Sequence, residues 1–192
     1  MSDNLAYKLD RNEEVIDGVP VMMAPARSSH NRVKHKIAWI FESFLNGKRC
    51  EYLPDGEGLY LEEGAEEYIP NGMVVCDPEK VTEEGVFGAP DLVIEVLSPG
   101  TAKYDRGRKK DMYEKHGVRE YWIVSPRDLT IEQYILADGR FTLREVYRKY
   151  SGWEMKRMDP EERAAIPTEF KCSLFDDLTI RVDDVFDRVA AE

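Results

Sequence analysis

Apolar and polar positions near the N-terminus are arranged in a way that predicts a β-hairpin. Apolar residues at 15–16 and 19–23 flank Asp17-Gly18, and this dipeptide supplies the positive φ angles that a tight turn requires. Pro20 cannot donate a hydrogen bond to a neighbouring strand. We therefore expect its strand at a sheet edge or in a bulge.

A longer periodic stretch follows the hairpin. From His30 to Asn46 the apolar residues recur at steps of three and four positions, which is typical of one face of an amphipathic helix. Ser28 or Ser29 is expected to cap this helix, and Gly47 is expected to stop it.

Short strands and a second helix account for most of the remaining pattern. Strands are expected near 59–61, 68–76, 92–97 and 120–124, a helix at 101–115 capped by Thr101 and closed by His116-Gly117, a hairpin at 130–136 and 141–147, and tail elements at 173–175, 178–180 and 183–189. This order of elements predicts an α/β (α+β) fold with one mixed sheet.

Length and composition are those of one globular domain. The chain has 192 residues, of which 42% are hydrophobic and 10% aromatic. This apolar surface is enough to offset the chain entropy that folding removes. At roughly 150 residues per domain, we expect a single domain spanning 1–192.

Targeting signals and cysteine usage suggest a compartment. The sequence has no run of about 20 apolar residues that could span a bilayer, and residues 1–4 lack the basic start of a secretory signal. We therefore expect a cytoplasmic protein without membrane association. Cys50, Cys76 and Cys172 are too few and too scattered for a disulfide framework or a zinc site, so reduced structural thiols are expected.

The charge is unevenly distributed along the chain. The net charge of -11 argues against a protein that coats DNA nonspecifically, because such binding needs basic surface. From Glu51 to Glu95 there are 13 acidic residues and one basic residue, whereas seven basic and three acidic residues lie between Thr101 and Arg119. The charge runs alone favour a solvated helix beside an acidic surface. The alternative is a cation site beside a helix that faces phosphate.

Two carboxylates interrupt the apolar strand expected at 92–97. Asp91 and Glu95 are four residues apart and share a face, because side chains alternate along a strand. Leu92, Ile94 and Val96 point to the other face. A carboxylate among buried apolar residues needs a partner, since an unpaired buried charge is costly.

A cation is one such partner, but Asp91 and Glu95 cannot share it on a regular strand. Their α-carbons are expected about 13 Å apart at roughly 3.3 Å per residue. A second ligand must come from another element, and Asn71 interrupts the apolar pattern of the preceding strand. Asn71 opposite Glu95 is therefore the predicted metal pair.

The second helix carries a possible catalytic base or cation. Lys109 lies one helical turn from Asp105 and one turn from Tyr113, so the three side chains share one stripe. On spacing alone, Asp105 and Lys109 are expected to form an ordinary surface ion pair. His30, at the start of the first helix, is expected to be a cap or packing residue.

Several motifs together resemble the Uma2 family of the PD-(D/E)xK restriction-endonuclease-like superfamily. They cover nearly the whole chain from residue 14 to residue 180, and they comprise Glu14-Val15-Ile16-Asp17-Gly18, the approach from Met23-Ala24-Pro25 to His30, Val74-Val75-Cys76-Asp77, the segment 88–99, Asp105 with Lys109 and Tyr113, and the segment 117–124.

The resemblance implies a restriction-endonuclease-like mixed sheet flanked by helices, with the core order αβββαβ and added N- and C-terminal hairpins. It implies a divalent-metal-dependent nuclease that uses Mg²⁺ or Mn²⁺. Glu95 matches the family's glutamate. Lys109 takes the place of the superfamily's lysine, where this chain has Leu97, and Asp91 matches the strand-opening aspartate, with a structural role favoured by the distance argument.

Asn71 departs from the family pattern, which has an aspartate after the proline. An amide oxygen can bind a hard cation, but one negative charge is lost and the affinity should fall. The implied catalytic residues are Glu95, Lys109 and Asp91, and the implied metal ligands are Asn71, Glu95 and Asp91.

Three functions follow. The first is a metal-dependent endonuclease that acts on nucleic acid, with DNA preferred over RNA as the substrate. The second is a nuclease-derived binding or assembly protein whose site has decayed at Asn71. The third is an enzyme of the same fold that acts on another phosphodiester. Exposed sheet edges also lead us to expect a homodimer.

Overall fold

The computed structural model of the protein describes residues 13–22 and 26–190. Residues 1–4, on which the absence of a secretory signal was argued, lie outside the described residues. So do Met23, expected at the end of the first hairpin, and the Met23-Ala24-Pro25 part of the family motif.

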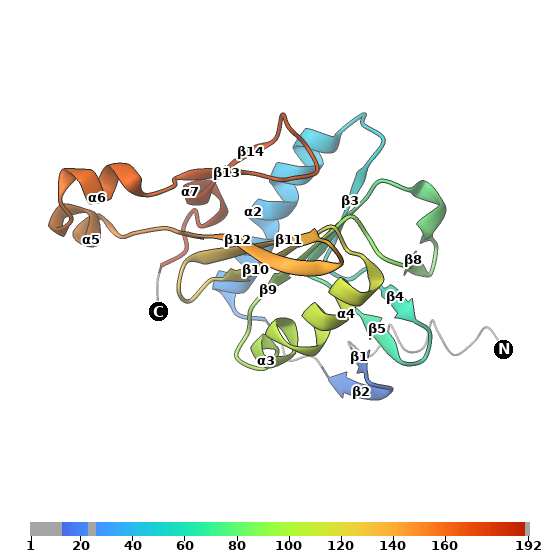
Figure 1. The fold of residues 1–192 in the computed structure, drawn as a ribbon. Helices are drawn as coiled ribbons and strands as arrows, with labels where there is room; N and C mark the ends of the chain where they lie inside the picture. The colour runs from blue at the N-terminus through green and yellow to red at the C-terminus, as the bar shows by residue number, and fades with distance from the viewer. Residues whose placement is uncertain (1–12, 23–25, 191–192) are drawn as a thin grey trace.

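A six-stranded mixed sheet forms the centre of the fold (Figure 1). Its order is β12-β11-β10-β9-β6-β3, and β9 and β10 pair in parallel while the other neighbours pair antiparallel. The strands are β3 (Glu51–Pro54), β6 (Gly72–Val75), β9 (Leu92–Val96), β10 (Glu120–Ser125), β11 (Thr130–Ala137) and β12 (Arg140–Arg148).

A second sheet of six short strands packs beside the central one, and a two-stranded sheet follows near the C-terminus. The order of the second sheet is β2-β1-β5-β4-β8-β7. Its strands are β1 (Glu13–Ile16), β2 (Val19–Met22), β4 (Leu59–Glu62), β5 (Glu66–Tyr68), β7 (Val81–Thr82) and β8 (Gly85–Phe87), and the small sheet pairs β13 (Glu169–Lys171) with β14 (Thr179–Arg181).

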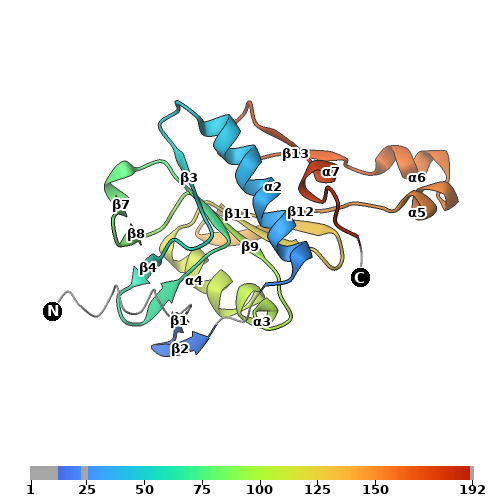
Figure 2. The same cartoon turned by 180° about the vertical axis from the view of Figure 1, so that it is seen from behind.

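Helices cover both faces of the central sheet (Figure 2). The longest helix, α2, lies on one face together with the C-terminal segment, and α4 lies on the other face. The helices are α2 (Ser28–Leu45), α3 (Ala102–Arg106), α4 (Arg108–His116), α5 (Gly152–Arg157), α6 (Pro160–Ala165) and α7 (Val182–Val185), with a 3₁₀ turn, η1 (Pro78–Lys80).

The alternation of side chains along β9 divides the core into two clusters. Leu92, Ile94 and Val96 pack against the buried face of α2. Val93 faces the other cluster, in which α4 and the second sheet meet the central sheet. The predicted alternation along this strand is confirmed, and it turns the neighbouring position 95 toward α4.

The first hairpin and the first helix form as predicted, with one correction. Asp17 and Gly18 have φ angles of 53° and 72°, and β2, which contains Pro20, is the edge strand. The expected serine cap of α2 is wrong. Its N-cap residue is Arg27, which makes no side-chain capping hydrogen bond.

The second helix is interrupted, although its end is where the sequence placed it. Gly107 separates α3 from α4. Thr101 is the N-cap residue of α3, as predicted, but its side chain makes no capping hydrogen bond. Gly117 adopts φ 85° and ends α4, as expected for a glycine in the left-handed region.

The core order αβββαβ is confirmed, with one strand reassigned. It runs α2, β3, β6, β9, the α3–α4 segment and β10. The strand expected at 59–61 lies in the second sheet, and the first core strand is β3, whose four residues are too few for a clear pattern. The expectation of one mixed sheet was incomplete because of this second sheet.

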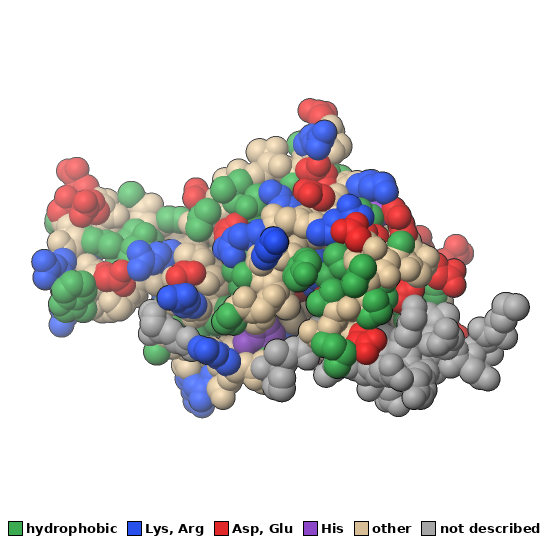
Figure 3. Space-filling view, turned by 90° about the horizontal axis from the view of Figure 1, so that it is seen from below, with side chains coloured by type: hydrophobic (Ala, Val, Ile, Leu, Met, Phe, Trp, Pro, Cys, Tyr) green, Lys and Arg blue, Asp and Glu red, His purple; other side chains and the backbone are tan. Residues whose placement is uncertain are grey.

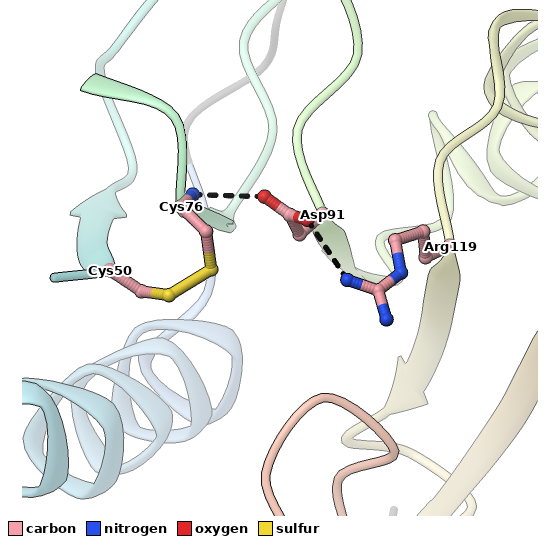
Figure 4. Close-up of a disulfide and its surroundings, with 4 residues drawn as sticks. All are labelled: Cys50, Cys76, Asp91 and Arg119. Atoms are coloured by element: carbon pink, nitrogen blue, oxygen red, sulfur yellow. Dashed lines mark hydrogen bonds and ion pairs between the residues drawn. A yellow bond between two sulfur atoms is a disulfide. The ribbon is translucent and has the colours of Figure 1, made fainter.

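Cys50 and Cys76 form a disulfide, which corrects the expectation that all three thiols are reduced (Figure 4). The register pairs Glu51 with Val75, so the residues just outside this pair, Cys50 and Cys76, face each other. The pairing could not be read from the sequence because β3 and its register were not predicted. Cys172 is a buried free cysteine, as expected.

A helical arm extends from the end of β12 (Figure 1). It comprises α5 and α6, neither of which contains a buried residue. Each begins with a capping box, formed by Ser151 with Glu154 and by Asp159 with Glu162. The spacing of these pairs is a readable helix-start signal that the sequence prediction did not use. No described helix is long and apolar enough to cross a membrane.

Candidate active site

Glu95 occupies the middle of the protein, on the central strand β9. Its side chain faces α4 and is 2% exposed. Tyr113 of α4 donates a hydrogen bond from its hydroxyl to Glu95 Oε1 over 2.8 Å. The glutamate predicted as the centre of the site is therefore held rigidly between a strand and a helix.

Lys109 brings three carboxylates together around one ammonium group. Its Nζ atom lies 2.7 Å from Glu14 Oε1, 3.1 Å from Glu95 Oε1 and 3.5 Å from Asp105 Oδ1. All four side chains are almost completely buried. The expectation that Asp105 and Lys109 form a surface ion pair is wrong, because both groups lie inside the protein.

Four elements supply this cluster, which we call the Lys109 cluster and define as Glu14, Glu95, Asp105 and Lys109. Glu14 comes from β1, Glu95 from β9, Asp105 from α3 and Lys109 from α4. The predicted stripe of the second helix persists across the break at Gly107, since Asp105 and Lys109 remain in contact.

The Lys109 cluster holds more carboxyl groups than ammonium groups. Three carboxylates surround one ammonium group, and burial makes each unneutralised charge costly. Burial raises the pKa of Glu95 from 4.5 to about 8, with Lys109 opposing this shift and Asp105 and Glu14 adding to it. Burial also raises the pKa of Asp105.

Burial and the neighbouring charges also shift the pKa values of Lys109 and Tyr113, the two proton donors beside the carboxylates. Burial alone would lower the pKa of Lys109, but the three carboxylates raise it well above its usual value. Burial and the neighbouring Glu95 raise the pKa of Tyr113. Both groups therefore keep their protons at neutral pH and remain donors.

The donor chemistry of the Lys109 cluster fits a hard divalent cation. Its carboxylate oxygens are of the type that Mg²⁺ prefers, and among the described residues Asp105 forms its one ion pair with Lys109, at 3.5 Å. The spacing is less favourable. Among the described residues, no three His, Cys, Asp or Glu side chains are grouped closely enough to hold a metal ion. The ammonium of Lys109 takes the position between the carboxylates.

Asn71 lies directly before β6, and its side chain bonds to groups outside the Lys109 cluster. Its amide oxygen accepts a hydrogen bond from the backbone N–H of Val96 over 2.7 Å, and its Nδ2 donates to Asp55 over 3.0 Å. In the described part of the chain it shares no hydrogen bond with Glu95. The predicted metal pair of Asn71 and Glu95 stays a prediction, which requires Asn71 to turn.

Asp91 lies just before β9, where it joins two other elements (Figure 4). One oxygen accepts a hydrogen bond from the backbone N–H of Cys76 over 2.9 Å, and the other lies 3.3 Å from Arg119. Within the described residues no contact joins it to the Lys109 cluster. These contacts favour the structural role over direct metal binding, and its predicted part in catalysis stays a prediction.

Glu14 is the member of the Lys109 cluster that reasoning from the residues missed. The resemblance included its hairpin but gave this glutamate no role. It lies 95 positions from Lys109 in sequence, and its second partner is the backbone N–H of Ile69 at 2.9 Å. A signal did exist, because Glu14 is a charged residue directly before the buried pair Val15 and Ile16.

Comparison with known proteins identifies a family. Residues 4–164 match the family model of Uma2, which is described as "Putative restriction endonuclease". Two proteins of Synechocystis sp. are similar, uncharacterized protein slr1290, with 29% identity over 63% of this chain and 64% of its own length, and uncharacterized protein sll1609, with 24% identity over 63% and 70%. The chain thus spans slightly less than two thirds of the first of these relatives.

A solved structure shares the fold. It is the crystal structure of "a putative nuclease belonging to DUF820" from Anabaena variabilis, with a TM-score of 0.68, 17% sequence identity, and coverage of 94% of this chain and 93% of that one. At this identity the likeness establishes the fold and not the activity.

Proposed function

The chain belongs to the Uma2 family, and from this premise we propose that it is a divalent-metal-dependent endonuclease that hydrolyses phosphodiester bonds in nucleic acid. The observation that carries the proposal is the Lys109 cluster. Three buried carboxyl groups share one ammonium group there, in a family whose description is "Putative restriction endonuclease". A buried group of carboxyl groups with raised pKa values is expected where a site is built to receive a cation, because the cation replaces their protons.

The proposal assigns each residue a role. Glu95 would hold the cation, with oxygens from Asp105 or Glu14 and, after a change of side-chain orientation, from Asn71. A divalent cation in such a site polarises a phosphoryl oxygen and lowers the pKa of a bound water. Mg²⁺ or Mn²⁺ suits these oxygen donors.

In this proposal Lys109 stabilises charge on the substrate, while Tyr113 and Asp91 position other parts of the site. Lys109, which keeps its proton, would stabilise the charge that develops on the phosphoryl oxygens, as buried cations do in phosphoryl transfer. The hydroxyl of Tyr113 fixes the orientation of Glu95. Asp91 would act by positioning the start of β9 through Cys76 and Arg119.

A second candidate is a nuclease-derived binding or assembly protein, and two observations favour it. Both polar atoms of the Asn71 amide are engaged elsewhere, and Glu95 is closed from solvent. Such a protein would keep the fold and lose the cation. It could work as a homodimer through the exposed edge strand β12, where Leu143 and Val146 are exposed.

Cleavage of supercoiled plasmid, single-stranded DNA and RNA in Mg²⁺ or Mn²⁺ tests the proposal. We would compare the native chain with Glu95→Ala, Asn71→Asp and, as a matched control, Glu145→Ala, which removes an exposed glutamate of β12. The expected result is cleavage by the native chain and the control, faster on DNA than on RNA, and about a hundredfold or greater loss in Glu95→Ala.

Two other results would contradict the proposal, the first its activity and the second its site. Cleavage by Asn71→Asp alone would identify a decayed site, and calorimetry should then show Mg²⁺ binding to that variant but not to the native chain. Full activity of a folded Glu95→Ala would remove Glu95 from the site.

A further inference from the structure

A pocket separate from the Lys109 cluster opens at the carboxyl ends of the parallel strands β9 and β10. Its volume is about 250 Å³, and it lies where Leu97 and Ser98 leave β9 and where Ser125 ends β10. The start of α2 forms one wall, and α3 forms another through Ala102 and Arg106. In open sheets, ligands bind outside the carboxyl ends of parallel strands.

The lining of this pocket is basic, although the chain as a whole is acidic. Arg27, Arg106 and Arg127 all contribute, against a single acid, Asp128. Asp128 is already bound to the hydroxyl of Ser125 over 2.7 Å. Arg106 pairs with Glu132, whereas Arg127 makes no ion pair or hydrogen bond within the described part of the chain. The net charge of the lining favours an anion.

The start of α2 adds hydrogen-bond donors to the same wall. The first backbone N–H groups of a helix have no partner inside it, and the helix dipole favours a negative charge there. No acidic residue lies in the first turn of α2, and no side chain caps it. This 18-residue helix thus presents an uncapped N-terminus beside the pocket.

His30 provides an independent indication of a ligand. It lines the pocket, it is 8% exposed, and its Nδ1 atom has no hydrogen-bond partner among residues 13–22 and 26–190. Burial and the nearby charge of Lys34 lower the pKa of His30, while the backbone of Val96 and the side chain of Asn31 oppose this shift. A buried ring nitrogen without a partner is costly, and an anion beside it would hold a second proton on the ring as a donor. His30, predicted to be a cap or packing residue, therefore has a polar atom that neither role uses.

The size of the pocket limits what can occupy it. A volume of about 250 Å³ lies below the roughly 300–1,000 Å³ of pockets that take drug-sized ligands. A duplex cannot enter such a space, but one phosphate with its attached sugar can.

Basic side chains (blue) and a histidine (purple) are visible on the face of the molecule that Figure 3 shows.

We propose that this pocket binds the terminal phosphate of a nucleic-acid strand. The arginines and the first turn of α2 would bind the phosphate oxygens, and His30 would donate to one of them. Leu97, two residues beyond Glu95, places the bound end close to the strand that carries the candidate active site. That the bound phosphate belongs to a nucleic-acid strand rests on the proposed function. That the pocket binds an anion does not.

Fluorescence anisotropy of labelled single strands tests this proposal without any cleavage. The native chain would be titrated in EDTA, at fixed ionic strength, with the same short DNA strand carrying a 5′-phosphate, a 3′-phosphate or only hydroxyl ends. We expect one of the phosphorylated strands to bind at least about tenfold more tightly than the hydroxyl strand. Because no metal is present, this result does not depend on nuclease activity.

Two arginine variants locate the site. Arg127→Glu changes an exposed side chain, so the fold should persist, and it is expected to remove the preference for the phosphorylated end. Arg144→Glu, an equal charge change at an exposed position of β12, is expected to leave it unchanged. His30→Asn, checked for folding by circular dichroism, should weaken the same preference.

Several results would overturn the proposal. One is equal affinity for phosphorylated and hydroxyl strands. Another is an equal loss of affinity in Arg127→Glu and Arg144→Glu. A third is inorganic phosphate that competes as well as the phosphorylated strand does, since the pocket would then be a site for free phosphate and not for a strand end.

Discussion

Two buried glutamates on neighbouring strands, Glu95 on β9 and Glu120 on β10, have the same chemistry and opposite surroundings. Glu120 is completely buried and is surrounded by neutral donors. It accepts hydrogen bonds from Trp122 Nε1 at 2.5 Å, Gln133 Nε2 at 2.6 Å and the backbone N–H of Ser173 at 2.7 Å. The hydroxyl of Ser173 donates as well. These donors solvate the carboxylate fully and tie β10 to β11 and to the C-terminal segment.

Glu95 has fewer donors and more competitors. It shares the ammonium of Lys109 with Glu14 and Asp105, and Tyr113 supplies its neutral hydrogen bond. Its raised pKa reports the result, a carboxylate that burial and its neighbours push toward the neutral form. The comparison teaches that burial alone does not mark a functional acid. What distinguishes Glu95 is that its surroundings would not fully compensate a negative charge on it, so its carboxyl group is pushed toward the neutral form.

Removing the cation of the cluster should produce the largest effect. Lys109→Met would leave three buried carboxylates without an ammonium group, and we expect it to lower the free energy of unfolding by about 3–5 kcal/mol. Urea unfolding at pH 7, followed by circular dichroism, measures this change. Lys110→Met is the matched control, because Lys110 is on the same helix but lies outside the Lys109 cluster, with its ammonium group 4.0 Å from the centre of the Tyr134 ring.

The same variant shows whether the carboxylates accept a divalent cation. Millimolar Mg²⁺ is expected to stabilise Lys109→Met more than the native chain, since the cation can then occupy the position of the ammonium group. Equal stability of the Lys109 and Lys110 variants would contradict the view that Lys109 neutralises the site.

A smaller loss of stability is expected at Glu120, whose carboxylate is bound by neutral donors. Glu120→Gln places an amide N–H against groups that already donate, and leaving one of them unsatisfied should cost about 1–3 kcal/mol. Urea unfolding measures the loss, and cleavage assays on the folded variant should give a rate close to that of the native chain. If the Glu120→Gln protein were stable but had lost cleavage activity, Glu120 would belong to the active site, and the two glutamates would not differ in role.

The sequence revealed those parts of the fold that depend on local chemistry. The Asp17-Gly18 turn could be predicted because few dipeptides adopt its φ angles, and α2 because its apolar positions repeat. Glu95 could be identified because a charge within an apolar strand needs a partner, and the link from Asp105 to Lys109 because i and i+4 share a helix face.

What the sequence did not reveal depends on pairing between distant segments. Glu14 reaches Lys109 only because β1 joins the second sheet through β5, and a single pair, Val15 with Glu67, defines that junction. The disulfide depends in the same way on the register of β3 with β6. The burial of Asp105 and Lys109 was missed because helix spacing places residues on a stripe without saying what covers that stripe.

The smallest predicted effect is on the pH dependence of the free energy of unfolding. It is seen by comparing the native protein with Glu95→Gln, in which an uncharged amide replaces the carboxyl group. The folded state holds the proton of Glu95 up to about pH 8, whereas the unfolded chain releases it near 4.5. Between these values the folded state binds more protons than the unfolded state, so the stability of the metal-free protein should fall as the pH rises. Glu95→Gln removes this proton and should flatten the dependence by about 1 kcal/mol between pH 6 and pH 7.

The variant isolates this one group because the other titrating groups are common to both proteins. The lowered pKa of His30 gives stability that rises with pH below 6.5, and this contribution cancels when the two proteins are compared. Urea unfolding in EDTA at pH 6, 7 and 8 measures the difference. If the native protein and Glu95→Gln lose stability equally as the pH rises, Glu95 holds no extra proton in the folded state, and its raised pKa no longer separates it from Glu120.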